Sequence, residues 1–212
     1  MAHRFYIYSN LKGFVPKVKL YSPASVILAG NFGSITDEKT WTNVKTIREQ
    51  GFTNIFWVPY LTEFSSSNHC HDVRHLGTEF DMRCRDNGVT PLNNEVVTFK
   101  GLKIVGSAML PITYNYYYAA EDAEFMHSEA TVDSLIIAGS ICPTLKAKYV
   151  IHGTPPTGEN FCVSNEDQMH ITNSRDAIGF HERFYVDIKC CNSGHCRCLN
   201  NINCFSSQSD LE

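Results

Sequence analysis

The sequence lacks any long apolar segment. No stretch reaches the roughly 18 consecutive apolar residues that a membrane-spanning helix needs. The first residues, MAHRFYIYS, also lack the apolar core of a signal peptide. We therefore expect a protein without membrane contact that stays inside the cell, in the cytoplasm or the nucleus.

An excess of positive charge is missing too. The chain has 18 Lys and Arg against 22 Asp and Glu, which gives a net charge of -4 at pH 7. This charge offers no general attraction to nucleic acid, so we expect no nucleic-acid partner. Cysteine, by contrast, is plentiful. Nine cysteines in a chain with no export signal indicate reduced thiols rather than a disulfide framework.

Internal repeats and flexible linkers are also lacking, so one domain is expected. The chain has 212 residues, of which 43% are hydrophobic, and this is enough for a single domain with a substantial core. We place the domain at residues 1–188. Residues 189–212 are rich in Cys, Asn and Ser, show no hydrophobic periodicity, and are expected to form a flexible tail.

The order of apolar and amphipathic segments predicts an α/β fold. Short runs that are apolar on both faces predict buried strands at 5–9, at 25–30, at 54–59 and within 146–158, where the strand ends at His152. Residues 36–51 predict a helix that Thr36 or Asp37 caps and Gly51 ends. Residues 94–110 predict a hairpin with Lys100 and Gly101 at its tip.

Three further regions carry weaker patterns. Residues 60–87 are polar, which indicates a loop. The segment AEDAEFMHSEATVDSLIIAGSI, at 120–141, is expected to form a helix that follows a loop. Residues 175–191 are expected to contain two strands joined by a turn.

Polar side chains follow several of the predicted strands. Asn10 and Lys12 follow the first strand, Asn31 follows the second, and His152 ends a later one. Chemistry is common where a strand ends and a loop begins. Structural roles are the alternative, because lysines are mostly exposed, asparagines favour turns, and an isolated histidine usually bonds to a neighbouring loop.

Six short motifs stand in order along the chain: SNLKG, ILAGNFGS, NIFWVPYLTEF, NGVTPLNNEVVTFKGLKIVGSAM, KYVIHGTPPTG and AIGFHERF. Together they resemble the calcineurin-like metallophosphoesterases, over nearly the whole chain to Ile188. The resemblance implies a four-layer αββα sandwich. It also implies hydrolysis of phosphoesters by a water that bridges two metal ions.

The sequence departs from that family's pattern at most metal-ligand positions. The family's ligands and its catalytic histidine fall on Asn10, Lys12, Asn31, Leu61, Thr62 (the catalytic position), Phe180 and Glu182, whereas His152 is kept and His181 is displaced by one position. Two lost carboxylates and one added ammonium change the local charge by about three units, and each unit is worth several kcal/mol at close range.

We therefore expect a degenerate, catalytically inactive protein that acts by binding and needs no cofactor. Its expected ligand-binding residues are Asn10, Lys12, Asn31, His152 and Glu182, with the Lys12 ammonium in place of a metal. The expected partner is a phosphorylated small molecule or another protein. A degraded motif set of this kind is also typical of a fast-evolving gene, for example a viral one.

Two alternatives stay open. An active phosphoesterase with a rearranged site would hold Mn or Zn through His152, His181 and Glu182, with His69, His71 and His75 as further candidates. A zinc site in the tail would use Cys191, Cys196, Cys198 and Cys204, although their spacing differs from the usual paired C-x2-C pattern. The aromatic stretch YNYYY, at 114–118, either stacks on a ligand or packs its loop against the fold.

Overall fold

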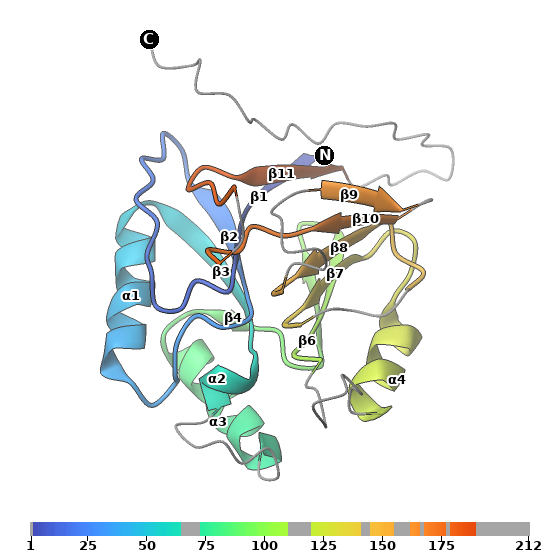
Figure 1. Ribbon diagram of the computed structural model, residues 1–212, viewed down its shortest axis with the longest axis horizontal. Coiled ribbons are helices and arrows are strands. Elements are labelled where there is room, and N and C mark those ends of the chain that lie inside the picture. Colours follow the sequence, from blue (N-terminus) through green and yellow to red (C-terminus); the bar gives the residue numbers. More distant parts are fainter. Residues whose placement is uncertain are drawn as a thin grey trace.

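The computed structural model describes residues 2–64, 73–109, 120–140, 145–154, 162–165, 168–176 and 179–189. These residues form a mixed α/β fold with two mixed sheets (Figure 1). Sheet one has the strand order β11 (Tyr185–Lys189), β1 (Ala2–Ser9), β2 (Ala24–Ala29), β3 (Phe52–Val58) and β4 (Thr90–Pro91). Sheet two has the order β5 (Glu95–Phe99), β6 (Leu102–Ser107), β7 (Leu135–Ala138), β8 (Tyr149–His152), β10 (Gln168–Ile171) and β9 (Cys162–Asn165).

Four helices accompany the sheets in the described part of the chain. They are α1 (Glu38–Glu49), α2 (Leu61–Phe64), α3 (Val73–Asp86) and α4 (Ala120–Glu129). Helix α1 is capped by Asp37, whose side chain accepts a hydrogen bond from the main-chain N–H of Lys39, as expected for an N-cap. Among the helices described, none has the length and apolar character needed to cross a bilayer.

One face of each sheet contributes to a shared apolar cluster. Alternate residues of β1, Phe5 and Ile7, are fully buried in this cluster together with Ile104 and Ile137 of sheet two. Because side chains alternate along a strand, Tyr6 and Tyr8 lie on the opposite face of β1 and pack in another cluster. The two sheets are therefore held together mainly by buried aliphatic and aromatic side chains.

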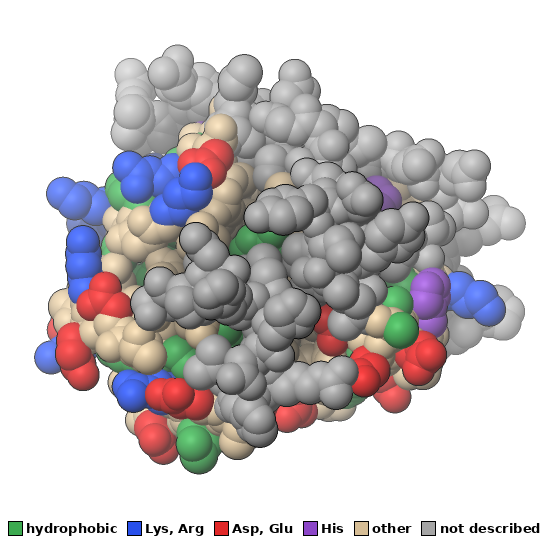
Figure 2. All heavy atoms as spheres, turned by 60° about the horizontal axis from the view of Figure 1, so that its bottom comes forward, with side chains coloured by type: hydrophobic (Ala, Val, Ile, Leu, Met, Phe, Trp, Pro, Cys, Tyr) green, Lys and Arg blue, Asp and Glu red, His purple; other side chains and the backbone are tan. Residues whose placement is uncertain are grey.

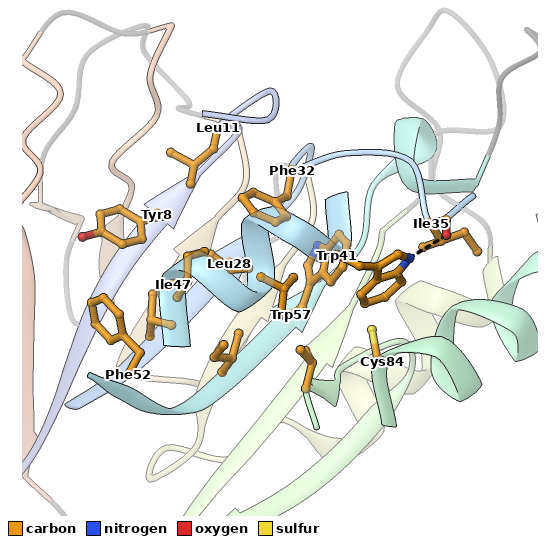
Figure 3. Close-up of a cluster of buried hydrophobic side chains, with 14 of the residues drawn as sticks. Tyr8, Leu11, Leu28, Phe32, Ile35, Trp41, Ile47, Phe52, Trp57 and Cys84 are labelled. Atoms are coloured by element: carbon orange, nitrogen blue, oxygen red, sulfur yellow. Dashed lines mark hydrogen bonds between the residues drawn. The ribbon is translucent and has the colours of Figure 1, made fainter. Parts of the chain in front are cut away.

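The other face of sheet one packs against α1 and α3 (Figure 3). Trp57 of β3 lies at the centre of this cluster, with its ring centroid 5.4 Å from that of Phe32, 5.8 Å from Trp41 and 5.2 Å from Phe80. The indole N–H of Trp41 donates to the main-chain oxygen of Ile35 at 2.9 Å. On sheet two, Met126 of α4 packs in a third cluster with outward-facing strand residues such as Val105 and Ile136.

Most of the predicted strands and the first helix are confirmed. Strands β1, β2, β3 and β8, helix α1 and the β5–β6 hairpin lie where the sequence predicts them. Lys100 and Gly101 form the hairpin tip with φ values of 50° and 84°. Gly51 follows α1 with φ 106°, a conformation that glycine adopts without strain.

Three element predictions were wrong. Residues 60–87 contain α2 and α3 rather than only loop. The predicted helix at 120–141 ends at Glu129, and its apolar second half forms strand β7. The described part of 175–191 contains one strand, β11, instead of two. The error at β7 has a simple cause, because a short apolar run such as LIIA fits a buried helix and a buried strand equally well.

Glycine backbones fill the space where the carboxyl ends of the two sheets meet. Gly30 follows β2, Gly139 follows β7 and Gly153 follows β8. A Cβ on Gly139 would lie 2.0 Å from the main-chain oxygen of Pro59, and a Cβ on Gly153 would lie 2.0 Å from that of Gly139. The two sheets therefore approach each other too closely here for any side chain.

Candidate ligand-binding site

The turn after β1 has an unusual backbone. Asn10 and Lys12 have φ values of 49° and 50°, in the left-handed region that non-glycine residues rarely adopt. Main-chain bonds hold the turn to the end of β2: Asn10 N–H donates to Ala29 at 2.9 Å, and Lys12 N–H donates to Asn31 at 2.8 Å. Strain of this kind clusters at functional sites, which makes the turn a candidate site.

The side chains of that turn meet on a single oxygen atom. The Asn10 amide donates to Oδ2 of Asp176 at 2.9 Å, and the Lys12 ammonium lies 2.5 Å from the same atom. The Lys12 side chain is 52% exposed and that of Asp176 is 45% exposed. An exposed ion pair like this contributes only about 0.2–1 kcal/mol to stability. The contact thus identifies an anion position without holding the fold together.

A second contact joins the same two loops. The guanidinium of Arg175 lies 4.3 Å from the ring centroid of Phe14, a cation–π arrangement. The Phe14 ring in turn meets Phe180 edge-on, with centroids 5.9 Å apart. The loop that carries Lys12 and Phe14 is therefore paired with the loop that carries Arg175 and Asp176.

A buried asparagine, Asn173, connects the 173–181 segment to strand β1. Asn173 is fully buried, and its amide donates to the main-chain oxygens of Ile7 at 2.9 Å and His181 at 3.0 Å. Its side-chain oxygen accepts from His181 N–H at 3.1 Å. Ser9 N–H donates to the main chain of Asn173 at 3.0 Å, so the 173–181 segment is fastened to β1.

A buried carboxylate fixes the neighbouring loops. Glu63, in α2, is fully buried and accepts hydrogen bonds from the main-chain N–H groups of Phe32, Gly33 and Tyr60. Burial raises the pKa of Glu63 to about 7, and the three N–H donors oppose this rise. Glu63 therefore holds the loop after β2, which includes Asn31, against the loop after β3.

His152 has a histidine partner. Its Nε2 lies 2.7 Å from Nδ1 of His170 in β10, and the two rings are stacked with centroids 5.0 Å apart. Burial, reinforced by the nearby His170, lowers the pKa of His152 to about 4, against the opposing hydrogen bond with the main chain of Ser140. The pair is therefore uncharged at neutral pH, and His152 is 1% exposed.

The structure divides the sequence-predicted site residues into groups. Asn10 and Lys12 share Asp176, with the backbone of Asn31 beside them, whereas His152 contacts His170. His181 and Glu182 make main-chain contacts: His181 with Asn173, and the Glu182 oxygen with the Tyr8 hydroxyl at 2.6 Å. Within the described ranges, no group of three or more His, Cys, Asp or Glu side chains is arranged to hold a metal ion.

Several candidates lie outside the described residues. They are His69 and His71, residues 114–118, and the tail cysteines Cys191, Cys196, Cys198 and Cys204. The side chains of Leu61, Thr62 and His75 are likewise not described, although their backbones belong to α2 and α3. Strand β11 extends to Lys189, and the rest of the predicted tail, 190–212, is not described.

Sequence reasoning missed four residues of this region: Glu63, His170, Asn173 and Asp176. Glu63 could have been found from its place in the polar stretch directly after β3. His170 alternates with apolar residues in QMHI, the pattern of a half-buried strand. Asn173 and Asp176 carry no local signal, because their partners in β1 and the turn after it lie 166 positions away in the sequence.

The charge distribution is uneven. In Figure 2 most of the visible Lys and Arg side chains lie on the half of the molecule that contains sheet one, whereas Asp and Glu side chains lie on both halves. Lys12 and Arg175 are exposed cations of the two paired loops beside sheet one. The Asp176 carboxylate thus lies 2.5 Å from one of these cations and follows the other directly in the sequence, in a protein whose net charge is -4.

Comparison with known proteins shows the fold alone. No family model matches the chain, and no curated protein matches it either. A similar solved structure is the phosphopantetheinyl hydrolase PptH from Mycobacterium tuberculosis. It has a TM-score of 0.53 and 12% sequence identity, and the match covers 80% of this chain and 88% of that chain.

These comparisons overturn the family assignment made from the motifs. The chain matches no family model, and a structural neighbour is a phosphopantetheinyl hydrolase at 12% identity. Three of the six motifs, SNLKG, ILAGNFGS and the hairpin motif, have a simpler explanation in turn geometry. Gly13 and Gly30 both have φ 74°, and Lys100 and Gly101 form a tight hairpin turn. Such residues follow strands in many α/β folds, so they indicate chain reversals rather than a shared chemistry.

Proposed function

We propose that this protein acts by binding a phosphorylated small molecule, without catalysis, at the turn formed by Asn10 and Lys12. The observation that carries the proposal is the convergence of one amide and one ammonium on a single carboxylate oxygen. Both groups are hydrogen-bond donors, and together they suit a phosphoryl oxygen. Neither the Lys12 ammonium nor the Asn10 amide nitrogen is a ligand for a metal cation.

The surroundings support a rigid binding turn. The Asn10–Lys12 turn is bonded to β2, whose following loop is fixed by the buried Glu63. Asn173 fastens the opposing segment to β1. A turn held on both sides keeps its donors in place before a ligand arrives, which lowers the entropy cost of binding. We also propose a four-layer αββα arrangement, which agrees with the three separate apolar clusters.

The alternative function, a metal-dependent phosphoesterase built on His152, His181 and Glu182, has weaker support. The Nε2 atom of His152 is already engaged by His170. His181 uses its ring Nδ1 to accept the N–H of Arg183 at 3.1 Å. Both histidines would have to give up a present contact before they could share one ion.

The test is a titration of the full chain with phenyl phosphate, in which the backbone amide NMR signals of residues 10 and 12 are monitored. We expect saturable shifts of these signals in the wild type and their loss in Lys12→Met, which removes the charge and keeps the side-chain length. Lys45→Met is the control, because Lys45 is an exposed lysine on α1. Release of phenol in the presence of Mn²⁺ or Zn²⁺ would contradict the proposal and favour the phosphoesterase.

A further inference from the structure

We infer that the carboxylate of Asp176 is an internal substitute for the ligand's phosphoryl group, which displaces it to reach Asn10 and Lys12. This inference rests on the proposed function and adds its regulation. The protein would exist in a closed form, with Asp176 on the two donors, and in a ligand-bound form with Asp176 released.

The geometry of the closed form supports displacement. Asp176 offers the same oxygen, Oδ2, to Asn10 and Lys12, as one phosphoryl oxygen would. A phosphate monoester is also larger and carries close to two negative charges at neutral pH, so it can bond both donors at once. An ion pair as exposed as Lys12–Asp176 resists exchange only weakly, because water already solvates both partners.

A second contact, between Arg175 and Phe14, holds the turn that carries Asp176; we call this contact the latch. Arg175 precedes Asp176 and holds its guanidinium over the Phe14 ring at 4.3 Å. The Asp176 N–H also donates to the Ser174 hydroxyl at 3.3 Å, while Ser174 itself pairs with Ser9 at the end of β1. The 175–176 turn is therefore anchored at Ser174 and held at its outer end by exposed contacts, an arrangement in which the outer end can move.

The latch predicts an effect on ligand affinity that simple attraction of the ligand to a basic surface patch would not produce. Weakening the Arg175–Phe14 contact without changing any charge frees the turn and should increase affinity for a phosphomonoester. Phe14→Leu makes this change, because it keeps an apolar side chain packed against the cluster below sheet one and removes the ring under Arg175.

The experiment measures the dissociation constant of phenyl phosphate at constant ionic strength for the full-length wild type and three variants. Asp176→Asn removes the competing charge and keeps the side-chain size, and we expect it to tighten binding about three- to tenfold. Phe14→Leu should tighten it by a smaller factor. Asp133→Asn is the matched control, because it makes the same chemical change in an exposed turn before β7, and it should change affinity less than about twofold.

The outcomes separate this inference from the proposed function. If the wild type binds phenyl phosphate and Asp176→Asn binds it no more tightly, the inference is wrong and the proposed function stands. If neither binds it, the proposed function fails, and the inference fails with it. Binding by Asp176→Asn alone would support both, since the carboxylate would then block the site completely in the wild type.

Discussion

The ends of β1 and β8 carry side-chain pairs that differ in exposure. At β1, Lys12 and Asp176 form an ion pair in which both side chains are about half exposed. At β8, His152 is 1% exposed and its 2.7 Å contact with His170 joins two uncharged rings. Water competes for both members of the first pair, whereas in the second pair His152 is shielded from water and only His170 is partly exposed. We conclude that the first pair can exchange partners, as a binding site must, whereas the second contributes to the fold.

The largest expected effect concerns the buried region beside the end of β8, where Gly139 and Gly153 bring the two sheets into close approach. Gly139→Ala should destabilise the protein by about 3 kcal/mol, the upper end of the usual cost of overpacking, because the rigid main chain cannot move aside. The new Cβ would lie 2.0 Å from the Pro59 oxygen and 2.8 Å from that of Ala108. Urea unfolding of the full chain, followed by tryptophan fluorescence, measures the change in free energy.

Gly101→Ala is the control for this prediction. Gly101 has φ 84°, and a Cβ at this position would have no other atom within 4 Å, so its substitution adds strain and no clash. That strain should cost about 1–2 kcal/mol. Equal losses in the two variants would mean that the close approach of the sheets at Gly139 is not as tight as the structure describes.

The next effect distinguishes Glu63 from His152, two of the buried titratable groups, by the sign of their pH dependence. The pKa of Glu63 rises from 4.5 to about 7 on folding, so the folded state binds more protons between these values and stability falls as pH rises through them. The pKa of His152 falls from 6.5 to about 4, so stability instead rises with pH across that range. Each group alone contributes roughly 3 kcal/mol over its range.

The contributions of Glu63 and His152 oppose each other and nearly cancel between pH 4.5 and 6.5, the range that both shifts share. Glu63→Gln removes the falling contribution and should leave a stability that increases with pH. His152→Asn removes the rising contribution and should leave one that decreases with pH, offset in part by His170, whose pKa burial also lowers. Urea unfolding at several pH values measures both slopes. Slopes of the same sign in the two variants would contradict the assignment.

The sequence predicted the elements of the fold better than the contacts of the site. Strand β2 and helix α1 have local signals in the sequence. The first is an apolar run that ends at Gly30, and the second is a helical spacing of apolar residues that ends at Gly51. The partner of Lys12 has no local signal. Asp176 lies in the segment that leads from β10 of sheet two back to the end of β1, far from Lys12 in the sequence. Site geometry here depends on contacts between distant segments, which local patterns do not encode.

The motif resemblance illustrates the same limit. The motifs located Asn10, Lys12 and Asn31 correctly at neighbouring strand ends, since turns after parallel strands have recognisable residues. They did not identify a family, because a turn sequence reports backbone conformation and says little about chemistry. His152 was likewise placed at a strand end, but no local pattern indicated His170 as its partner.

The smallest expected effect on stability concerns the exposed pair. Lys12→Met should change the free energy of unfolding by less than about 1 kcal/mol, because the ion pair is solvated and its partner Asp176 returns to water at little cost. His170→Ala, which removes the partner of a buried ring, should cost more, about 1–3 kcal/mol. Urea unfolding of both variants at pH 7 and at low and high salt measures the difference, and only the Lys12→Met effect should shrink with salt. A loss in Lys12→Met as large as that in His170→Ala would mean that the β1 turn depends on its ion pair for folding, and that Asp176 is too firmly bound to be displaced.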